Sequence, residues 1–135
     1  MTLTLRVLAP DQSVFDGTAD EVILPSTTGQ LGVLTGHVSM LTALDSGVLR
    51  LRQGSSWISI ALFGGFAEVE ANEVTVLVNA AELGSAINRD AAQRELDAAQ
   101  QAFTALEGQP NSTEKVKAQQ QLSQARARLQ AAVGS

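Results

Sequence analysis

The stretch EVTVLVNAAELGSAINRDAAQRELDAAQQAFTALEG, residues 73–108, passes from one hydrophobic period to another. Its first six residues place valine at every second position, which is typical of a half-buried β-strand. Beyond Asn88 the apolar residues follow steps of four, three, four and three, the spacing of one helix face: Ala92, Leu96, Ala99, Phe103 and Leu106. The sequence therefore predicts an α+β chain, with strands before this junction and helices after it.

The part before the junction reads as a series of short strands. Five stretches mostly alternate apolar with polar residues, namely 2–8, 21–25, 48–52, 57–62 and 73–78. Turn pairs occur at 10–11, 16–17, 28–29, 46–47, 53–54, 64–65 and 71–72, a spacing typical of antiparallel sandwiches. We expect a β-sandwich over residues 1–84. Its expected core residues are Leu5, Val7, Val22, Leu24, Leu31, Val33, Leu49, Leu51, Ile58, Ile60, Phe66, Val74, Val76 and Val78.

The part after the junction reads as two helices. Gly108 and Pro110 supply stop signals for the first. Asn111 and Glu114 then resemble a capping box for a second helix. The stripe of that helix repeats the steps of the first: Ala118, Leu122, Ala125, Leu129 and Ala132. A short connection between two such helices predicts an antiparallel helical hairpin over residues 88–135.

The packing of this hairpin is expected to be weak. Both stripes alternate large and small residues, so few large side chains can be buried, while ordering the backbone costs conformational entropy. The sizeable side chains are Leu96, Phe103, Leu106, Val116, Leu122 and Leu129. We therefore expect a hairpin that is marginal alone and can exchange its resting contacts for those of another helical partner.

Composition excludes several classes of protein. The 135 residues contain no cysteine, which removes disulfides, thiolate nucleophiles and cysteine-ligated zinc. A net charge of -5 argues against general nucleic-acid binding, which uses a basic face. The longest nearly apolar runs are far shorter than the roughly 20 residues of a membrane span. The start, MTLTLRVLAPDQ, has no cationic leader, so we expect a protein that stays inside the cell and does not insert into the membrane.

Candidate residues for chemistry are scarce. His37 is the single histidine, and with no cysteine it cannot complete a typical zinc set, so we expect a structural or interface role and no metal. Gly29, Gly32 and Gly36 lack the strand-to-helix context of a nucleotide fingerprint and are expected in turns. No Gly-x-Ser-x-Gly elbow is present. The sequence predicts a chain that is not an enzyme and carries no cofactor.

Basic residues gather on the second predicted helix. They are Lys115, Lys117, Arg126 and Arg128. A solvated helix face and a surface that docks an acidic protein element explain this pattern equally well.

Two blocks carry a resemblance to a known family. They are GQLGVLTGHVSMLTALDSGVLRLR (residues 29–52) and ALFGGFAEVEANEVTVLVNAAE (residues 61–82). With the two C-terminal helices, they resemble the epsilon subunit of F-type ATP synthase essentially end to end. The opening Thr-Leu-x-Val-x-x-Pro and the Leu-Val-Asn-x-Ala-Glu at residues 77–82 are most similar to the cyanobacterial and chloroplast branch.

The resemblance implies a central-stalk subunit of a rotary motor. Its sandwich would grip the gamma subunit and stand on the c-ring, so that torque from proton flow reaches the catalytic head. The loop around Gln30, Leu31 and Gly32, together with His37, would face the c-ring. The first β-layer and the region of Gly64, Gly65 and Phe66 would face gamma. The protein would sit peripherally on the cytoplasmic or stromal face of the thylakoid membrane, within the F1 sector.

The helical pair resembles the regulatory element of this family, which rests on the sandwich or extends along gamma and hinders ATP hydrolysis. In the extended form the four basic residues of the second helix would meet acidic residues of the catalytic alpha and beta subunits. Some bacterial members also carry an Ile/Leu-Asp-x-x-Arg-Ala motif that helps bind ATP. Here the stretch has Ile87, Asn88, Ala91 and Ala92 at those positions, so the motif lacks its cation and its acid. We expect weak or absent ATP binding, with Asn88 acting as an N-cap.

Another class of protein remains open from the residues alone. A free-standing β-sandwich that binds a small ligand, with a helical appendage, fits the same periods. This alternative predicts a monomer that does not bind gamma, whereas a rotor subunit requires stable association with gamma.

Overall fold

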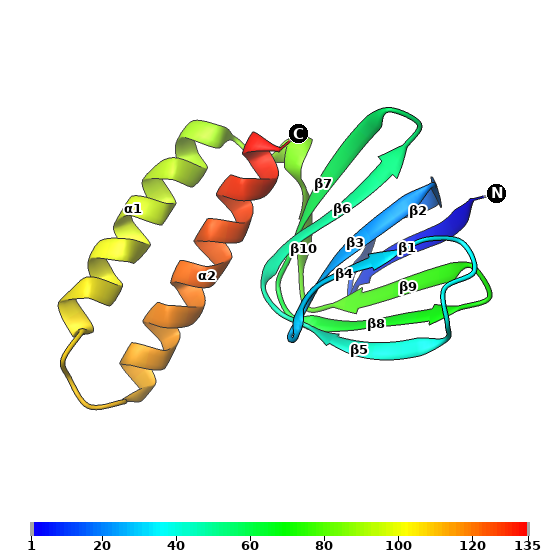
Figure 1. Cartoon of the computed structure of the whole chain (residues 1–135). Helices are drawn as coiled ribbons and strands as arrows, with labels where there is room; N and C mark the ends of the chain where they lie inside the picture. Colours follow the sequence, from blue (N-terminus) through cyan, green and yellow to red (C-terminus); the bar gives the residue numbers. More distant parts are fainter. Residues whose placement is uncertain (1, 135) are drawn as a thin grey trace.

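The computed structural model describes residues 2–134 and consists of ten strands followed by two long helices (Figure 1). The strands are β1 (Leu3–Ala9), β2 (Gln12–Ala19), β3 (Glu21–Ser26), β4 (Gly29–Val33), β5 (Met40–Leu44), β6 (Gly47–Gln53), β7 (Ser56–Leu62), β8 (Gly65–Glu70), β9 (Glu73–Val78) and β10 (Ala81–Leu83). A short 3-10 helix η1 (Gly84–Ala86) leads to α1 (Arg89–Leu106) and α2 (Thr113–Val133).

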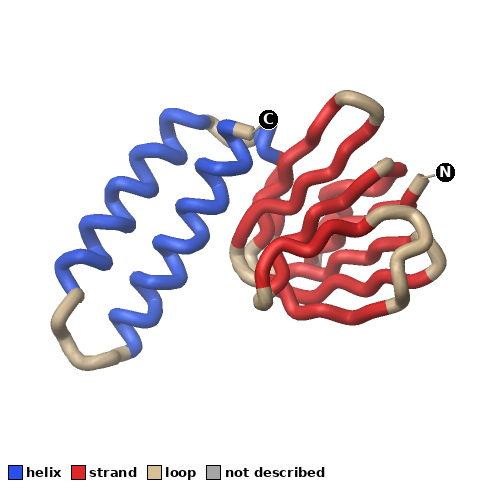
Figure 2. The backbone as a smooth tube through the Cα atoms, viewed as in Figure 1, coloured by secondary structure: helices blue, strands red, loops and turns tan. Residues whose placement is uncertain are grey.

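Strands and helices occupy separate regions of the molecule (Figure 2). The expected α+β class is confirmed. Met1 and Ser135, the ends of the two predicted segments, lie outside the described residues.

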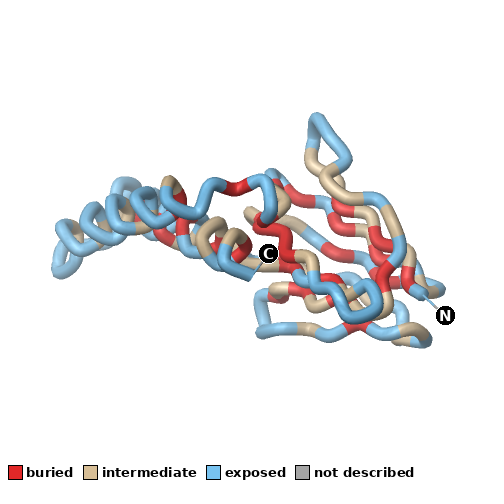
Figure 3. The backbone as a smooth tube through the Cα atoms, turned by 90° about the horizontal axis from the view of Figure 1, so that it is seen from above, coloured by how far each residue is buried: buried red, intermediate tan, exposed pale blue. Residues whose placement is uncertain are grey.

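One continuous sheet folds over into two facing layers. Its order is β10-β7-β6-β3-β5-β8-β9-β1-β2, with β4 paired to β3. The pairs are antiparallel except for β1 and β9, which run parallel. β3 and β5 share a single paired position, Ser26 with Leu44, and the sheet folds there. Buried residues alternate with less buried ones along many of the strands (Figure 3).

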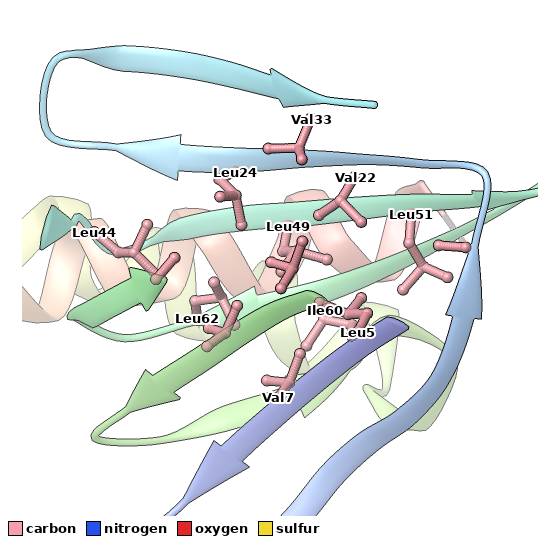
Figure 4. Packing of buried hydrophobic residues seen from close by; sticks show 14 of the residues in the cluster. Leu5, Val7, Val22, Leu24, Val33, Leu44, Leu49, Leu51, Ile60 and Leu62 are labelled. Carbon is pink, nitrogen blue, oxygen red and sulfur yellow. The ribbon is translucent and has the colours of Figure 1, made fainter. Parts of the chain in front are cut away.

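The core fills the space between the layers with aliphatic side chains from both (Figure 4). Eleven of the expected core residues are buried: Leu5, Val7, Val22, Leu24, Val33, Leu49, Leu51, Ile60, Val74, Val76 and Val78. Leu31 and Ile58 are half-buried and pack against this cluster. The expectation for Phe66 is wrong, because its side chain is 57% exposed while its neighbours Ala67 and Val69 on β8 point inward. Phe66 alternates with Glu68 and Glu70, so the two-residue period of β8 itself places Phe66 on the outer face.

Two other local expectations are wrong. The predicted turn at residues 16–17 lies inside β2, where Gly17 pairs with Leu5 of β1. Gln30, Leu31 and Gly32 were expected in a loop but belong to β4, and Leu31 pairs with Leu24 of β3. In both cases neighbouring strands supply backbone partners, and the ladder overrides the local turn preference of glycine.

Both helices begin at a side-chain cap. Asn88 Oδ1 accepts a hydrogen bond from the Ala91 N–H at 2.9 Å, as predicted for α1. For α2 the cap is Ser112, whose Oγ accepts from the Lys115 N–H at 3.2 Å, so the predicted cap at Asn111 is wrong by one residue. Ser112 has the extended backbone of an N-cap, and Glu114 then lies in the first turn, where the helix dipole favours a carboxylate. The connection turns at Gly108, which has a φ of +82°.

The helices form an antiparallel pair in which α2 lies between α1 and the strands (Figure 1). The predicted stripe of α2 is buried at Ala118, Leu122 and Ala125. A second buried set, Ala127 and Ala131, was missed by the sequence analysis. α2 therefore packs on two sides, whereas α1 packs mainly on α2.

Candidate functional site

The hairpin rests on the sandwich through a small apolar cluster near the junction of the two parts. Ala61 of β7, Ile87 of the linker, Ala92 of α1 and Ala131 of α2 are its buried members. The partly buried residues around it are Val48, Phe63, Leu129 and Ala132. The Ser59 hydroxyl adds a long hydrogen bond of 3.4 Å to the Gly134 carbonyl. Three of the four buried members are alanines, which contribute little apolar area each.

An ion triad lies beside this cluster and joins three elements. The guanidinium of Arg128 on α2 binds Glu82 of β10 through two nitrogens, Nε to Oε1 at 2.9 Å and Nη2 to Oε2 at 3.3 Å. Its remaining nitrogen, Nη1, pairs with Oε2 of Glu95 on α1. Hydrogen bonding to Glu82 is the largest cause of a raised pKa for Arg128, and Glu95 raises it further against the opposing effect of burial. Arg128 therefore keeps its charge throughout the physiological pH range.

The other three basic residues of α2 lie apart from this triad. Lys115 Nζ donates to the Gln109 carbonyl at 3.1 Å, next to the connection between the helices. Lys117 is exposed. Arg126 Nη2 donates to Gln100 Oε1 of α1 at 3.4 Å. At about 1.5 Å of rise per residue, Lys117 and Arg126 are about 14 Å apart along the helix, so the four do not form one compact basic surface.

The residues at the positions of the ATP motif have other tasks here. Asn88 caps α1, and Ile87 and Ala92 are buried in the apolar cluster. Ala91 is half-buried and donates its backbone N–H to the cap. None of these four side chains carries a charge that could pair with a phosphate. Within residues 2–134, no group of three His, Asp or Glu side chains is placed to hold a metal ion.

The residues expected to face the c-ring are divided between the two ends of β4. Gln30 pairs with Pro25 beside the turn that joins β3 and β4. His37 lies in the loop after β4, where its Nδ1 is 2.8 Å from the Val38 carbonyl oxygen. The neighbouring Gly36 N–H donates to Asn72 Oδ1 at 2.7 Å, which ties this loop to the turn between β8 and β9. The loop exposes two apolar side chains, Leu34 and Val38.

The region expected to face gamma opens onto an apolar row on the outer face of the sheet. In the strand register, Ala43 of β5 pairs with Phe66 of β8, Phe66 with Leu77 of β9, and Leu77 with Leu8 of β1. Paired residues share a face, so these four side chains form a row across four strands. Phe66 and Leu77 are more than half exposed, and with Leu8 and Pro10 they line a shallow hollow. We call the four residues of the row, with the exposed Leu41 next to them on β5, the outer apolar row.

Sequence reasoning missed most of this row. The sequence carries two usable signals: Leu77 breaks the alternation of EVTVLV, and Phe66 shares its strand face with Glu68 and Glu70. The backbone conformation explains why two glycines, Gly64 and Gly65, precede Phe66. Gly64 has a φ of +70° and Gly65 one of +146°, and a Cβ on Gly65 would overlap the Leu77 carbonyl oxygen. The pair lets β8 start close against β9, which places Phe66 beside Leu77.

The family model described as "ATP synthase, Delta/Epsilon chain, beta-sandwich domain" matches residues 2–84. The chain is 71% identical over 131 residues to the ATP synthase epsilon chain of Synechococcus sp. (strain CC9902), covering 97% of this chain and 96% of that one. It belongs to the ATP synthase epsilon chain family.

Other members of the epsilon chain family are nearly as similar. The protein of Prochlorococcus marinus (strain MIT 9211) is 66% identical over 131 residues, 97% of this chain and 97% of that one. The expected likeness to cyanobacterial epsilon chains is confirmed. A chain of the Euglena gracilis mitochondrial ATP synthase OSCP/F1/c-ring structure has a TM-score of 0.80 over 98% of this chain and 81% of its own, at 20% identity. A chain of the Tetrahymena thermophila central stalk and c-ring structure has a TM-score of 0.61, covering 97% and 96%, at 16% identity. These two likenesses show the shared fold.

Among the described residues, neither helix of this epsilon chain has an apolar stretch long enough to cross a membrane.

Proposed function

We propose that this chain is a non-catalytic rotor subunit of a proton-translocating ATP synthase. Its sandwich links the gamma subunit to the c-ring, and its helical hairpin restrains ATP hydrolysis. The observation that carries this proposal is the match to epsilon chains over 97% of the sequence, which includes the helices as well as the sandwich. A free-standing ligand-binding module does not account for that extent of match.

The outer apolar row is the proposed contact with gamma. A soluble protein rarely leaves large aliphatic and aromatic side chains aligned across four strands without a partner. Phe66 and Leu77 are the apolar residues that β8 and β9 place on this face, while the opposite face of the same strands already lines the core. The occupant we infer is an apolar surface of gamma, because a rotor subunit must stay attached to gamma through every rotation.

The proposed contact with the c-ring comprises Gln30, Leu31 and Gly32 on β4 and His37 in the following loop. The exposed Leu34 and Val38 extend the loop's surface beyond His37. Contact with the c-ring through these residues would place the protein peripherally on the F1 side of the thylakoid membrane, the cytoplasmic or stromal side. A chain with the same fold occurs in the Tetrahymena thermophila central stalk and c-ring structure.

The proposed inhibitory element is the hairpin in an extended position against the catalytic subunits. Lys115, Lys117, Arg126 and Arg128 are the candidate contacts to acidic residues there. Reversing the first three charges tests this role without opening the Arg128 ion pairs. Relief of inhibition is expected, and unchanged inhibition would count against the role.

Deletion of residues 88–135 tests the division of labour. The truncated chain is reassembled with the remaining subunits, and ATP hydrolysis and proton-driven synthesis are both measured. We expect hydrolysis to rise while synthesis remains coupled. Loss of coupling, or hydrolysis at the level of the full chain, would contradict the proposal. Association of the full chain with gamma is the accompanying control, because a ligand-binding module would remain a monomer.

A further inference from the structure

The docked hairpin is held at one end only. The apolar cluster and the ion triad both involve the C-terminal half of α2, where Arg128 and Ala131 lie. The N-terminal half faces the sandwich across a polar cleft, lined on the α2 side by Val116, Gln119, Gln120 and Ser123 and on the other by Leu44, Asp45, Ser46 and Gly64. An open, largely polar cleft supplies little apolar adhesion. Docking therefore depends on the few contacts near the junction.

The ion triad is asymmetric. Glu82 belongs to β10 and receives two of the guanidinium nitrogens, whereas Glu95 belongs to α1 and receives one. The Glu82 pair therefore crosses the boundary between hairpin and sandwich, and the Glu95 pair lies within the hairpin. A forked pair of this kind is among the stronger side-chain contacts because both hydrogen bonds fix the geometry.

We propose that Arg128 is an electrostatic latch with two separable arms. The Glu82 arm holds the hairpin on the sandwich, and the Glu95 arm holds α1 against α2. Loss of the Glu82 arm alone releases the hairpin as an intact unit, because Arg128 remains paired with Glu95. The latch is a property of the isolated chain, so it stands independently of the contacts with gamma, the c-ring and the catalytic subunits.

The exposure of the three side chains sets how the latch responds to solution conditions. Arg128 is 25% exposed, Glu82 39% and Glu95 51%. Salt screens charges that reach the solvent, so the Glu95 arm weakens first and the Glu82 arm at higher ionic strength. By contrast, the raised pKa of Arg128 makes its contribution insensitive to pH over the physiological range. Its contribution is complete below the ordinary pKa of arginine and is lost only as the pH rises through the still higher folded value.

The latch is tested with spin-label distances in the full chain. The sequence has no cysteine, so two introduced cysteines are labelled cleanly. The pair Ser55→Cys with Gln120→Cys measures the distance from sandwich to α2. The pair Gln101→Cys with Gln120→Cys measures the distance from α1 to α2. All three positions are exposed.

The two carboxylates give different expected results. Glu82→Gln should raise the population with a long sandwich-to-α2 distance about fivefold, in the range of a partly exposed forked pair, and leave the α1-to-α2 distance unchanged. Glu95→Gln should broaden the α1-to-α2 distance and leave the other unchanged. Arg126→Gln is the matched control, because Arg126 is bonded within the hairpin, and it should not move the sandwich-to-α2 distance.

The proposal is overturned if Glu82→Gln leaves the sandwich-to-α2 distances as they are in the parent, or if it separates the two helices from each other as well. Circular dichroism of each variant shows that the helices are formed, so that a change of distance reports undocking. Raising the salt from about 0.05 M to about 1 M should lengthen the sandwich-to-α2 distance in the parent chain and also broaden the α1-to-α2 distance, because both arms are screened.

Discussion

Phe66 of β8 and Leu77 of β9 are directly paired across the sheet on its outer face, and their side chains are 57% and 56% exposed. The pair lies at the centre of the outer apolar row, between Ala43 and Leu8. Phe66→Glu should therefore weaken the binding of gamma by at least about tenfold, since it places a charge at the centre of an apolar interface. Co-purification or surface plasmon resonance with gamma measures the effect.

A matched substitution on the other layer controls for surface charge. Trp57 is also an exposed aromatic residue, and it lies on β7, whose layer faces away from the outer apolar row. Trp57→Glu should leave gamma binding within about twofold of the parent, because substitutions outside an interface contribute little to affinity. Equal losses with both substitutions would place the contact elsewhere or show a general effect of charge.

Because β8 approaches β9 closely, a single methyl group added at Gly65 should strongly destabilise the sandwich. Gly65→Ala puts a Cβ against the Leu77 carbonyl oxygen, at a φ of +146° that alanine rarely adopts. We expect the free energy of unfolding to fall by roughly 2 kcal/mol or more, since both backbone strain and a steric overlap must be relieved. Gly32→Ala is the control, because no atom lies within 4 Å of its added Cβ and its φ is not positive. Urea denaturation of both variants measures the difference.

The largest loss of stability is expected from a substitution in the core of the sandwich. Leu49 on β6 and Leu5 on β1 are fully buried and come from opposite layers. Leu49→Ala should lower the free energy of unfolding by about 2–5 kcal/mol, because it removes apolar surface and leaves a cavity between the layers. Leu41→Ala, at an exposed leucine of β5, should change it by less than about 0.5 kcal/mol. A similar loss in both would show that burial does not govern stability here.

ATP binding is predicted to be weak or absent. Ala91 supplies no cation, Asn88 is engaged as a helix cap, and the guanidinium of Arg128 is already bound by two carboxylates. Isothermal calorimetry of the full chain with Mg-ATP at millimolar concentration should give no saturable heat. A tight complex would contradict this prediction. Ala91→Arg then tests whether the missing cation is the cause, because it restores only the charge.

The strand and helix regions could be predicted from the sequence because the two periods are strong and meet at one junction. The strand layer and most of the core followed from alternation, as at Val74, Val76 and Val78. The assignment of Phe66 to the core was wrong, because Phe66 alternates with Glu68 and Glu70 and therefore shares the outer face of β8 with them. The strand β4 was missed because glycines at 29 and 32 read as turn residues when their partner strand is unknown.

The candidate site was less predictable than the fold. The two carboxylates that hold Arg128 are 46 and 33 residues away in sequence, and no local pattern connects them. The second buried face of α2, with Ala127 and Ala131, was hidden because alanine is a strong helix former on exposed and buried faces alike. Both the partners of Arg128 and the second buried face of α2 depend on contacts between residues that are far apart in the sequence.

The cap of α2 gives a last prediction that distinguishes two adjacent residues. Ser112 accepts the Lys115 N–H, whereas Asn111 lies one residue before the cap. Ser112→Ala should therefore cost about 1 kcal/mol of helix stability and lower the helical signal of the hairpin, while Asn111→Ala should have little effect. Circular dichroism during thermal unfolding, followed at the helical minimum, measures both. Because α2 meets the sandwich mainly through its C-terminal half, fraying at Ser112 should leave the sandwich-to-hairpin contact at Arg128 intact. A larger loss with Asn111→Ala than with Ser112→Ala would move the start of the helix back to the residue that the sequence pattern favoured.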